Sequence, residues 1–497
     1  MKHGAAGFST GPVLAECRLR MVYIIIGAML LCWPPIATGD VFIFSDTKSF
    51  LKGGEVIPRM ILDRLDALSF VHKHDVPAVQ GDGPFELAED AEDGAPKFVR
   101  SFIYSLVAYG SVTIGGPIAL SFLQAVLVMT MVLQVVDREV LARPAFMLVG
   151  GVVLALTSSV AIYTSLLLPD ILAALIVLHA IVVAVHFDRM GRWSRIISTA
   201  LACFAVASHY GNPPLAMALY GATAIYLCIR RRLAWVRVLA LVLPVLFSPV
   251  ANLAASNAAL ETTSVSPLRL PILLARSIGD GPGLWYLQEV CPEADLAFCR
   301  LFGGHIPENM YDMLWGDEGI RSLTEQEMQE IRDEEFKILF LVFRAYPIAQ
   351  FEAIFGNAIR QIFMVGTTDL EVADHLDAGF DSVEAGNEAG VQLLRFYDRF
   401  LPFTTLFSLL LLASLVVLRR KREGADRDFA ETLALLVAGL VMNALIFGGL
   451  SAPVDRYQTR IVWLIELFAL LELARLFLWP SQEPERIETR GPTPDQA

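Results

Sequence analysis

Three acidic residues in this sequence have the type and position to do chemistry. Asp40 and Asp46 follow the first apolar run, in the stretch ATGDVFIFSDTKSF, and Asp170 lies between two later apolar runs. A carboxylate can accept a proton from an attacking hydroxyl group, or it can help to hold a divalent cation such as Mg²⁺ or Mn²⁺. Asp46 and Asp40 are therefore candidate catalytic acids. Asp170 is a candidate to complete a paired-carboxylate site that could bind such a metal.

Two arginines in the stretch GLSAPVDRYQTRIVWL could complement these acids. Arg456 and Arg460 carry guanidinium groups, which match phosphate oxygens in a two-pronged fashion. Tyr457 lies beside them and suits a membrane interface. His209, in SHYGNPP, lies at the end of another apolar run. We predict that these residues, together with Asp170, contact a substrate.

Each of these residues also has an ordinary structural interpretation. Asp40 or Asp46 could cap a short helix, and Asp170 could complement the positive end of the helix that follows it. The arginines could extend to the membrane surface or pair with a neighbouring acid. For Asp170, function is favoured because a carboxylate among leucines at a membrane boundary is costly unless something pairs with it or uses it.

The elements that must position these residues are apolar helices. The chain of 497 residues is 55% hydrophobic and 18% charged, whereas soluble domains carry about 25% charged residues. Apolar stretches of about 17–25 residues, the length that crosses a bilayer as a helix, recur from end to end. We predict an all-α polytopic membrane protein with about ten transmembrane helices, at 21–37, 115–136, 145–158, 168–187, 196–210, 213–229, 236–253, 401–418, 430–450 and 461–478.

The distribution of lysine and arginine predicts the orientation. The short loops that follow every second crossing are rich in arginine, as cytoplasmic loops are, and those on the other side have few or none. We expect a plasma (inner) membrane protein with both termini cytoplasmic and its large loops extracytoplasmic. A cleaved signal peptide is the competing interpretation of the N-terminus, but Trp33-Pro34-Pro35 stands where a peptidase needs small residues. The predicted parts are the N-terminus with its first helix at 1–37, a first loop at 38–114, helices at 115–253, a second loop at 254–400, helices at 401–478 and a cytoplasmic tail at 479–497.

The second large loop is expected to be partly helical. Thr324 and Glu327 form a capping box at the start of a helix that should end before Pro347. The stretch IAQFEAIFGNAIRQIF then has apolar residues at three- and four-residue spacing, which predicts an amphipathic helix. That helix could lie in the outer membrane interface or could cover the core of the loop itself, because periodicity does not identify the partner surface.

The net charge and the cysteines indicate which partners and which cross-link to expect. The net charge is −13, and most of the acidic excess falls on the predicted outer segments, which argues against nucleic acid as a partner. Cys291 and Cys299 share the outer stretch EVCPEADLAFCR and predict a disulfide in an oxidising compartment. Two free thiols are the alternative. A metal site is disfavoured because no second pair of ligands lies nearby.

The order of these features resembles the GT-C superfamily of membrane glycosyltransferases. In that family an acid follows the first crossing, a large first outer loop comes next, a second acid stands in a short outer loop, and a basic residue lies outside near the C-terminal end. The resemblance implies that Asp46, or Asp40 in its place, acts as base or binds metal. It maps the second acid onto Asp170 and the lipid-phosphate ligand onto Arg456. The implied function is transfer of a sugar from a polyprenyl-phosphate donor to an extracytoplasmic acceptor with inversion, in contact with membrane lipid.

The sequence also departs from the family, and two other functions compete with this one. The first-loop acids are not adjacent, and no WWDYG-type motif is present, so peptide glycosylation is not supported. A non-catalytic membrane assembly or envelope protein would tolerate substitution of Asp46, Asp170 and Arg456. A lipid or solute transporter would need polar groups along a path through the bilayer, whereas the polar residues here gather at one face.

Overall fold

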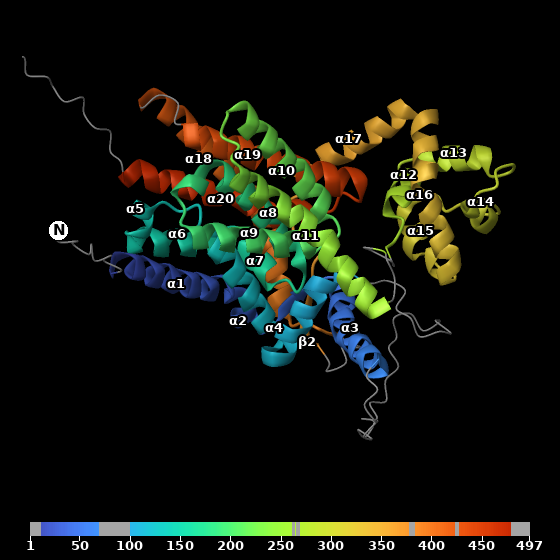
Figure 1. Ribbon diagram of the computed structural model, residues 1–497, viewed down its shortest axis with the longest axis horizontal. Coiled ribbons are helices and arrows are strands. Elements are labelled where there is room, and N and C mark those ends of the chain that lie inside the picture. Colours follow the sequence, from blue (N-terminus) through green and yellow to red (C-terminus); the bar gives the residue numbers. More distant parts are fainter. Residues whose placement is uncertain are drawn as a thin grey trace, which may run out of the picture.

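The structure is a computed structural model that describes residues 11–68, 100–260, 264, 269–376, 383–422 and 427–478. The predicted tail at 479–497 lies outside these residues, as does most of the first loop. Helices dominate, and the ten apolar segments predicted above lie largely within them (Figure 1). The main bundle consists of α1 (Gly11–Leu31), α2 (Trp33–Thr38), α3 (Asp46–Leu68), α4 (Phe102–Val132), α5 (Arg138–Leu141), α6 (Pro144–Thr157), α7 (Val160–Ser165), η1 (Pro169–Ile171), α8 (Leu172–Ile181), η2 (Val182–His186), η3 (Phe187–Arg189), α9 (Arg192–Ala207), α10 (Asn212–Ile229), α11 (Trp235–Leu260), α18 (Glu388–Arg422), α19 (Arg427–Asn443), η5 (Ala444–Gly449) and α20 (Asp455–Leu478).

Among the described residues, six helices are long and apolar enough to cross a membrane, so the chain has the helices of a polytopic membrane protein. The bent pair α16 (Glu325–Ala345) and α17 (Pro347–Phe363) would raise the number to seven if it counted as one span. Two further helices are not among the six. α6, with 14 residues, is shorter than a membrane-spanning helix, and α20 carries six charged residues along its length. The six are Phe102–Val132, Pro169–Arg189, Asn212–Ile229, Trp235–Ala259, Glu388–Arg419 and Arg427–Gly449.

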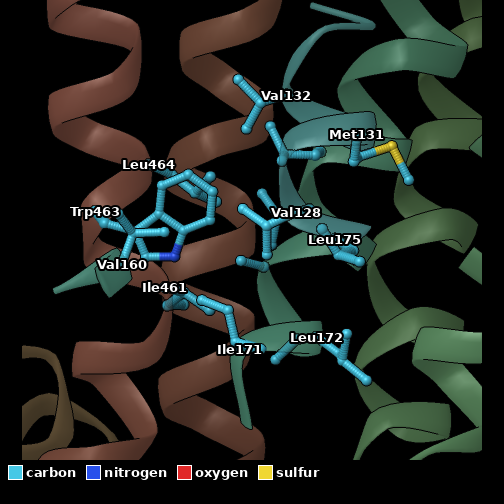
Figure 2. Packing of buried hydrophobic residues seen from close by; sticks show 14 of the residues in the cluster. Val128, Met131, Val132, Val160, Ile171, Leu172, Leu175, Ile461, Trp463 and Leu464 are labelled. Carbon is cyan, nitrogen blue, oxygen red and sulfur yellow. The ribbon is translucent and has the colours of Figure 1, made fainter. Parts of the chain in front are cut away.

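The continuous helical run Pro169–Arg189, which includes α8, forms the centre of the bundle. The most apolar part of this run is wholly buried. The reason is that α4, α9, α10, α19 and α20 all pack around it. Figure 2 shows side chains of α4, α8 and α20 meeting there, with Trp463 close to Val128. A helix enclosed in this way holds Asp170 at a fixed place inside the protein.

α4 begins before the predicted start of the second crossing. The helix begins at Phe102, well inside the predicted loop, and bends where Gly115 and Gly116 leave helical geometry. Gly116 has a φ of +72°, which an L-residue with a side chain rarely adopts. The part before the bend packs against α3. The predicted start of the second crossing, residue 115, coincides with this kink.

A small antiparallel sheet joins the two predicted loops, and the all-helical expectation did not include it. The strands β1 (Val41–Ile43), β2 (Glu371–Leu376) and β3 (Val383–Ala385) pair in that order, with Val41 opposite Ala373 and Ile43 opposite Glu371. α18 also begins inside the predicted second loop, at Glu388, so the expected boundary at 401 falls within a helix. The two predicted loops are therefore joined by backbone hydrogen bonds between their strands.

A second core lies at one end of the molecule, apart from the bundle (Figure 1). It is formed by a continuous stretch of chain, and α17 leads from it back to the bundle. The predicted capping box is present at Thr324 and Glu327, and α16 ends before Pro347 as predicted. The chain then bends by 109° into α17. The other elements of this core are α12 (Ile272–Gly279), α13 (Pro282–Val290), α14 (Ala297–Phe302), α15 (Met310–Trp315) and η4 (Ile320–Ser322).

Candidate functional site

Asp46 lies at the edge of a cluster of alternating charges. It is the first residue of α3, just after β1. Arg100, which precedes α4, places a guanidinium nitrogen 2.5 Å from one carboxylate oxygen of Asp46, and Arg456 places one 3.6 Å from the other. The Asp46 side chain keeps 18% of its surface exposed. It can therefore meet a molecule that approaches from outside the bundle.

Asp170 continues the cluster into the interior. Its carboxylate lies 3.2 Å from Arg460 and 3.9 Å from Arg456. Arg460 also donates a hydrogen bond of 3.0 Å to Asn443 Oδ1. Asp170 and Arg460 are 2% and 0% exposed. Charges this deeply buried are tolerated when they are paired and hydrogen-bonded, and the alternation of signs provides that pairing.

Aromatic rings hold the two arginine side chains in place. The guanidinium carbon of Arg456 lies 3.7 Å from the centre of the Phe44 ring, and that of Arg460 lies 3.9 Å from the centre of the Phe447 ring. Tyr457 is close to both arginines, at 4.9 and 5.1 Å. Such contacts between cations and ring faces favour the charged form and limit its movement.

A short contact between distant segments explains why the acids meet. Leu167 N donates to Phe42 O over 2.9 Å, so β1 lies along the segment that leads into Asp170. The chain between Phe42 and Asp46 then turns into α3. Of the residues that the sequence nominated, Asp46, Asp170, Arg456, Arg460 and Tyr457 come together. The structure places them side by side without assigning them a chemical role.

His209 is next to the cluster, in a supporting layer. Its ring packs against Phe447, with centroids 5.7 Å apart, and its Nδ1 accepts a hydrogen bond from Gly211 N. Phe447 in turn covers Arg460. His209 therefore contacts the residue that holds the arginine, and the structure gives no direct hydrogen bond from it to either acid.

Asp40 is placed elsewhere, in a structural setting. Its carboxylate accepts a hydrogen bond from Asn387 N, just before α18 begins. A Cβ atom at Gly390 would lie 2.3 Å from Asp40 Oδ2, so this glycine lets the helix approach closely. The Asn387 side chain caps the first amides of α18, and Asp40 in turn accepts from the backbone of Asn387, so Asp40 anchors the start of a distant helix and does not cap a short helix of its own segment.

A group of acids lies behind the backbone of Arg456. Asp369 accepts a hydrogen bond from Arg456 N, Asp398 accepts one from Thr367 N, and Asp455 accepts one from Thr368. Burial raises the pKa of Asp455, and the charges of Asp369 and Asp398 raise it further, against the opposing effect of the Thr368 hydroxyl. These bonds fix the short segment that carries the two threonines.

A cavity of about 740 Å³ adjoins this segment. Ile43, Thr367 and Thr368 form part of its wall, together with the acids Glu371 and Asp398. Ile43 precedes Phe44, whose ring covers Arg456, and Thr368 donates a hydrogen bond to Asp455, the residue before Arg456. Arg395 and Arg399 of α18 also line it. A second hollow of about 490 Å³ shares these two arginines and continues along Phe396, Phe400 and Phe403.

Sequence reasoning missed several of these residues. Arg100 is not among the residues that the sequence nominated. Arg395 and Arg399 were not noted, although their four-residue spacing puts both on one helical face beside phenylalanines. Both are exposed, and the structure shows no ion pair for either within the residues that it describes. Two arginines one helical turn apart among Phe396, Phe400 and Phe403 are the sequence signal that could have drawn attention to α18.

The donor groups of the cluster do not fit a divalent metal ion. Both nominated carboxylates, Asp46 and Asp170, already face guanidinium groups. Across the described parts of the chain, no group of three or more His, Cys, Asp and Glu side chains could hold a metal. The cluster therefore offers no ligand set for Mg²⁺ or Mn²⁺.

Comparison with protein-family models, with curated proteins and with solved structures gave no match for this chain.

Proposed function

We propose that this chain is a membrane glycosyltransferase of the GT-C type, which moves a sugar from a polyprenyl-phosphate donor to an extracytoplasmic acceptor. The observation that carries the proposal is the position of Asp46. It is the accessible carboxylate of a charge cluster in which Asp170, Arg456 and Arg460 are buried. A cavity whose wall includes Arg395 and Arg399, together with Glu371 and Asp398, reaches Ile43, three residues before Asp46 in the chain. Direct displacement at a sugar phosphate requires a fixed carboxylate for the acceptor proton and cationic groups for the phosphate.

The chemistry proposed for Asp46 is general base catalysis. Its carboxylate takes the proton of the acceptor hydroxyl group, and the hydroxyl oxygen forms a bond to the anomeric carbon of the donor. The bond from that carbon to the phosphate oxygen breaks at the same time, so the polyprenyl phosphate leaves with the bonding electrons. A single displacement of this kind inverts the anomeric centre. Arg100 and Arg456 hold the carboxylate in position from both sides.

The structure suggests a different place for the donor phosphate than Arg456. Arg456 is mostly buried, and its guanidinium group faces Asp46, Asp170 and Phe44. Arg395 and Arg399 are exposed and unpaired in the described structure, and the adjoining hollow has an aromatic wall. Guanidinium groups bind phosphate oxygens, and an apolar groove suits a lipid chain. We assign the phosphate to these two arginines and a positioning role to Arg456.

The proposed topology puts the cluster and the cavity outside. The loops predicted to be cytoplasmic gather at the other end of the bundle through ion pairs, among them Arg138 with Glu16, Arg232 with Glu431 and Arg475 with Asp137. A basic end facing the cytoplasm follows the usual rule for membrane proteins. Ten crossings and two cytoplasmic termini are consistent with this arrangement and remain part of the proposal.

The test is transfer by the purified full-length chain from polyprenyl-phosphate sugars. Asp46→Asn should lower the transfer rate by about 10²–10⁴, the contribution of a positioned general base, because the amide keeps the shape but cannot take the proton. Asp295→Asn, at an exposed acid of the second core, should leave the rate unchanged. Unchanged transfer by Asp46→Asn, with a folded protein, would remove Asp46 from the mechanism.

The donor site can be tested separately. Arg395→Gln and Arg399→Gln should raise the KM for the lipid donor more than they lower kcat, since they bind the group that leaves. Arg300→Gln is the control. Arg300 is an exposed arginine of the second core, it pairs with acidic residues there, and it does not line the cavity. Equal donor affinity in all three variants would contradict the assignment of the phosphate to α18.

One observation favours the non-catalytic assembly protein as a second candidate. Asp170 and Arg460 are almost completely enclosed, as members of a purely structural ion pair would be. In that case Asp46 would only close the end of the cluster. Failure to find transfer with any polyprenyl-phosphate sugar, together with a stable Asp46→Asn variant, is the result expected for this alternative.

A further inference from the structure

We infer that α17, with the adjoining half of α16, is a membrane-surface element that lies in the lipid headgroup region beside the transmembrane helices. The inference does not depend on glycosyl transfer. It settles the choice left open above, between a helix that covers the loop's own core and a helix that lies on lipid, in favour of lipid.

The apolar face of α17 points away from the protein. Ile348, Phe351, Phe355, Ile359 and Phe363 recur at three- and four-residue spacing, and every one of them is exposed, with Phe363 reaching 78%. A helix that covered a protein core would bury this face. The opposite orientation is typical of helices whose apolar side is covered by lipid.

The same face continues onto the C-terminal half of α16. Phe336, Phe340 and Phe343 lie on one side of that helix, and all are exposed, Phe340 by 68%. The Phe343 ring packs edge-on against Phe351, with centroids 4.7 Å apart, so the two helices share one apolar surface across their bend. Contiguous exposed apolar area of this extent marks an interaction surface.

The polar face of α17 is the one that packs against protein. Gln350 and Gln361 are buried. Gln350 accepts from Ser277, Gln361 both donates to Val454 O and accepts from Val454 N, and Asn357 donates to Asp280. Since the polar side chains are satisfied inside, rolling the helix over would break these hydrogen bonds and leave buried amides without partners.

α17 sits on the end of a transmembrane candidate, so its apolar face continues the lipid-facing surface. It packs against η5, the last part of the apolar run Arg427–Gly449. Cβ atoms at Gly448 and Gly449 would lie 2.3 Å from Gln361 Cβ and 2.9 Å from Ile354 O, so these glycines allow the close approach. A helix attached at this point lies where the bilayer core meets the headgroups.

The charges beside the apolar face fit anionic headgroups. Lys337, Arg344 and Arg360 are exposed, and the described structure shows no ion pair for any of them. Glu352 is the acid that accompanies them on α17. Cations that flank an apolar stripe attract the phosphates of an anionic leaflet, and this combination selects a lipid surface over a second protein.

The test uses the full-length chain in lipid nanodiscs with a nitroxide spin label at a chosen position. Cys17 and Cys228, the exposed free cysteines, are first replaced by serine. Labels on Phe355→Cys and Phe340→Cys are compared with a control label on Gln326→Cys, at an exposed position near the start of α16. Relaxation by oxygen, which concentrates in lipid, is measured against relaxation by a water-soluble nickel complex.

The labels at 340 and 355 should be relaxed several-fold more by oxygen than by nickel, whereas the order should reverse at 326. Adding anionic lipid should move the label at 355 deeper, and the triple change K337Q/R344Q/R360Q should abolish that movement. Nickel access at 355 equal to that at 326 would overturn the inference. Protection at 355 that appears only in nanodiscs holding two copies of the chain, with spin–spin broadening, would assign the face to self-association and overturn it as well.

Discussion

The charge cluster of the bundle and the second core are built on opposite plans. The cluster draws its members from segments as far apart as Asp46, Asp170 and Arg460, and an interior ion pair lies at its centre. The second core comes from one continuous stretch between Leu270 and Val342. The cluster therefore depends on the whole bundle, whereas the second core depends on local devices.

The local devices of the second core are easy to identify. A disulfide joins Cys291 to Cys299 across a sequence separation of eight. Thr324 caps α16, and Asn309 accepts hydrogen bonds from the first backbone amides of α15. Each contributes a modest and separable amount of stability. Substitutions in the cluster should therefore lower the stability of the whole bundle, whereas substitutions in the second core should destabilise only the helices around them.

The largest effect is expected from Arg460→Met. The change leaves Asp170 without its closest cation in a place that water does not reach, and breaking a buried pair in this way costs about 3–5 kcal/mol. Denaturation in detergent micelles, followed by circular dichroism, measures the free energy of unfolding. Arg300→Met removes an arginine with two acidic partners at an exposed position and should cause no measurable change.

A second change sharpens this result. Asp170→Asn in the Arg460→Met background removes the orphaned charge, so the double variant should lose less stability than the two single variants combined. Strict additivity of the two losses would mean that the residues do not act as a pair. The stability loss of Arg460→Met could then not be attributed to a buried ion pair.

The next largest effect should follow from replacing Cys291 and Cys299 together by serine. Closing a loop of this length restricts the unfolded chain by about 2–3 kcal/mol in the chain-entropy model. We expect hydrogen exchange to rise in α13, α14 and α16, which pack together, and to stay unchanged in α8. Faster exchange in α8 would show that the two regions unfold as one unit.

The sequence predicted the parts that rest on local rules. Apolar runs, the capping box at Thr324 and the stop before Pro347 each follow from a few neighbouring residues, and the structure has them all. Asp46, Asp170 and Arg456 were nominated because their residue types stand at the ends of apolar runs. Their meeting depends on β1 lying along Leu166 and Leu167, a contact between distant segments that no local pattern announces.

The misses have the same physical cause. β1 and β3 have three residues each, too few for an alternating pattern to be read. Asp40 and Asp46 look alike in the sequence, yet one lies at the start of α18 and the other faces arginines, because the sheet turns the chain between them. The outward orientation of α17 could not be derived from its periodicity, which is the same for either orientation.

A smaller effect is expected from Thr324→Ala. The Thr324 hydroxyl accepts a hydrogen bond from Glu327 N and donates one to the Glu327 carboxylate. Losing an N-cap of this kind costs about 1 kcal/mol. Hydrogen exchange should rise in the first turns of α16 while the end of that helix and the bundle keep their protection. Thr324→Ser, which retains the hydroxyl, is the matched control and should behave like the parent chain.

The smallest effect is a pH dependence at Glu327. Hydrogen bonds from the Thr324 hydroxyl and backbone amide lower the pKa of Glu327 from its ordinary value of 4.5. Because the folded state lowers this pKa, the unfolded state binds protons first as the pH falls, so the stabilisation is complete above pH 4.5 and is lost as the pH falls through the folded value. Glu327→Gln, which can still form the capping box, should therefore exchange faster than the parent chain at the start of α16 at neutral pH, and the difference should vanish in acid. In the Thr324→Ala background, the difference in exchange between Glu327 and Gln at position 327 should depend less on pH. The reason is that the Thr324 hydroxyl is the largest cause of the lowered pKa of Glu327. A pH dependence of equal size in both backgrounds would place its origin outside the capping box and would remove this local device from the contrast with the cluster.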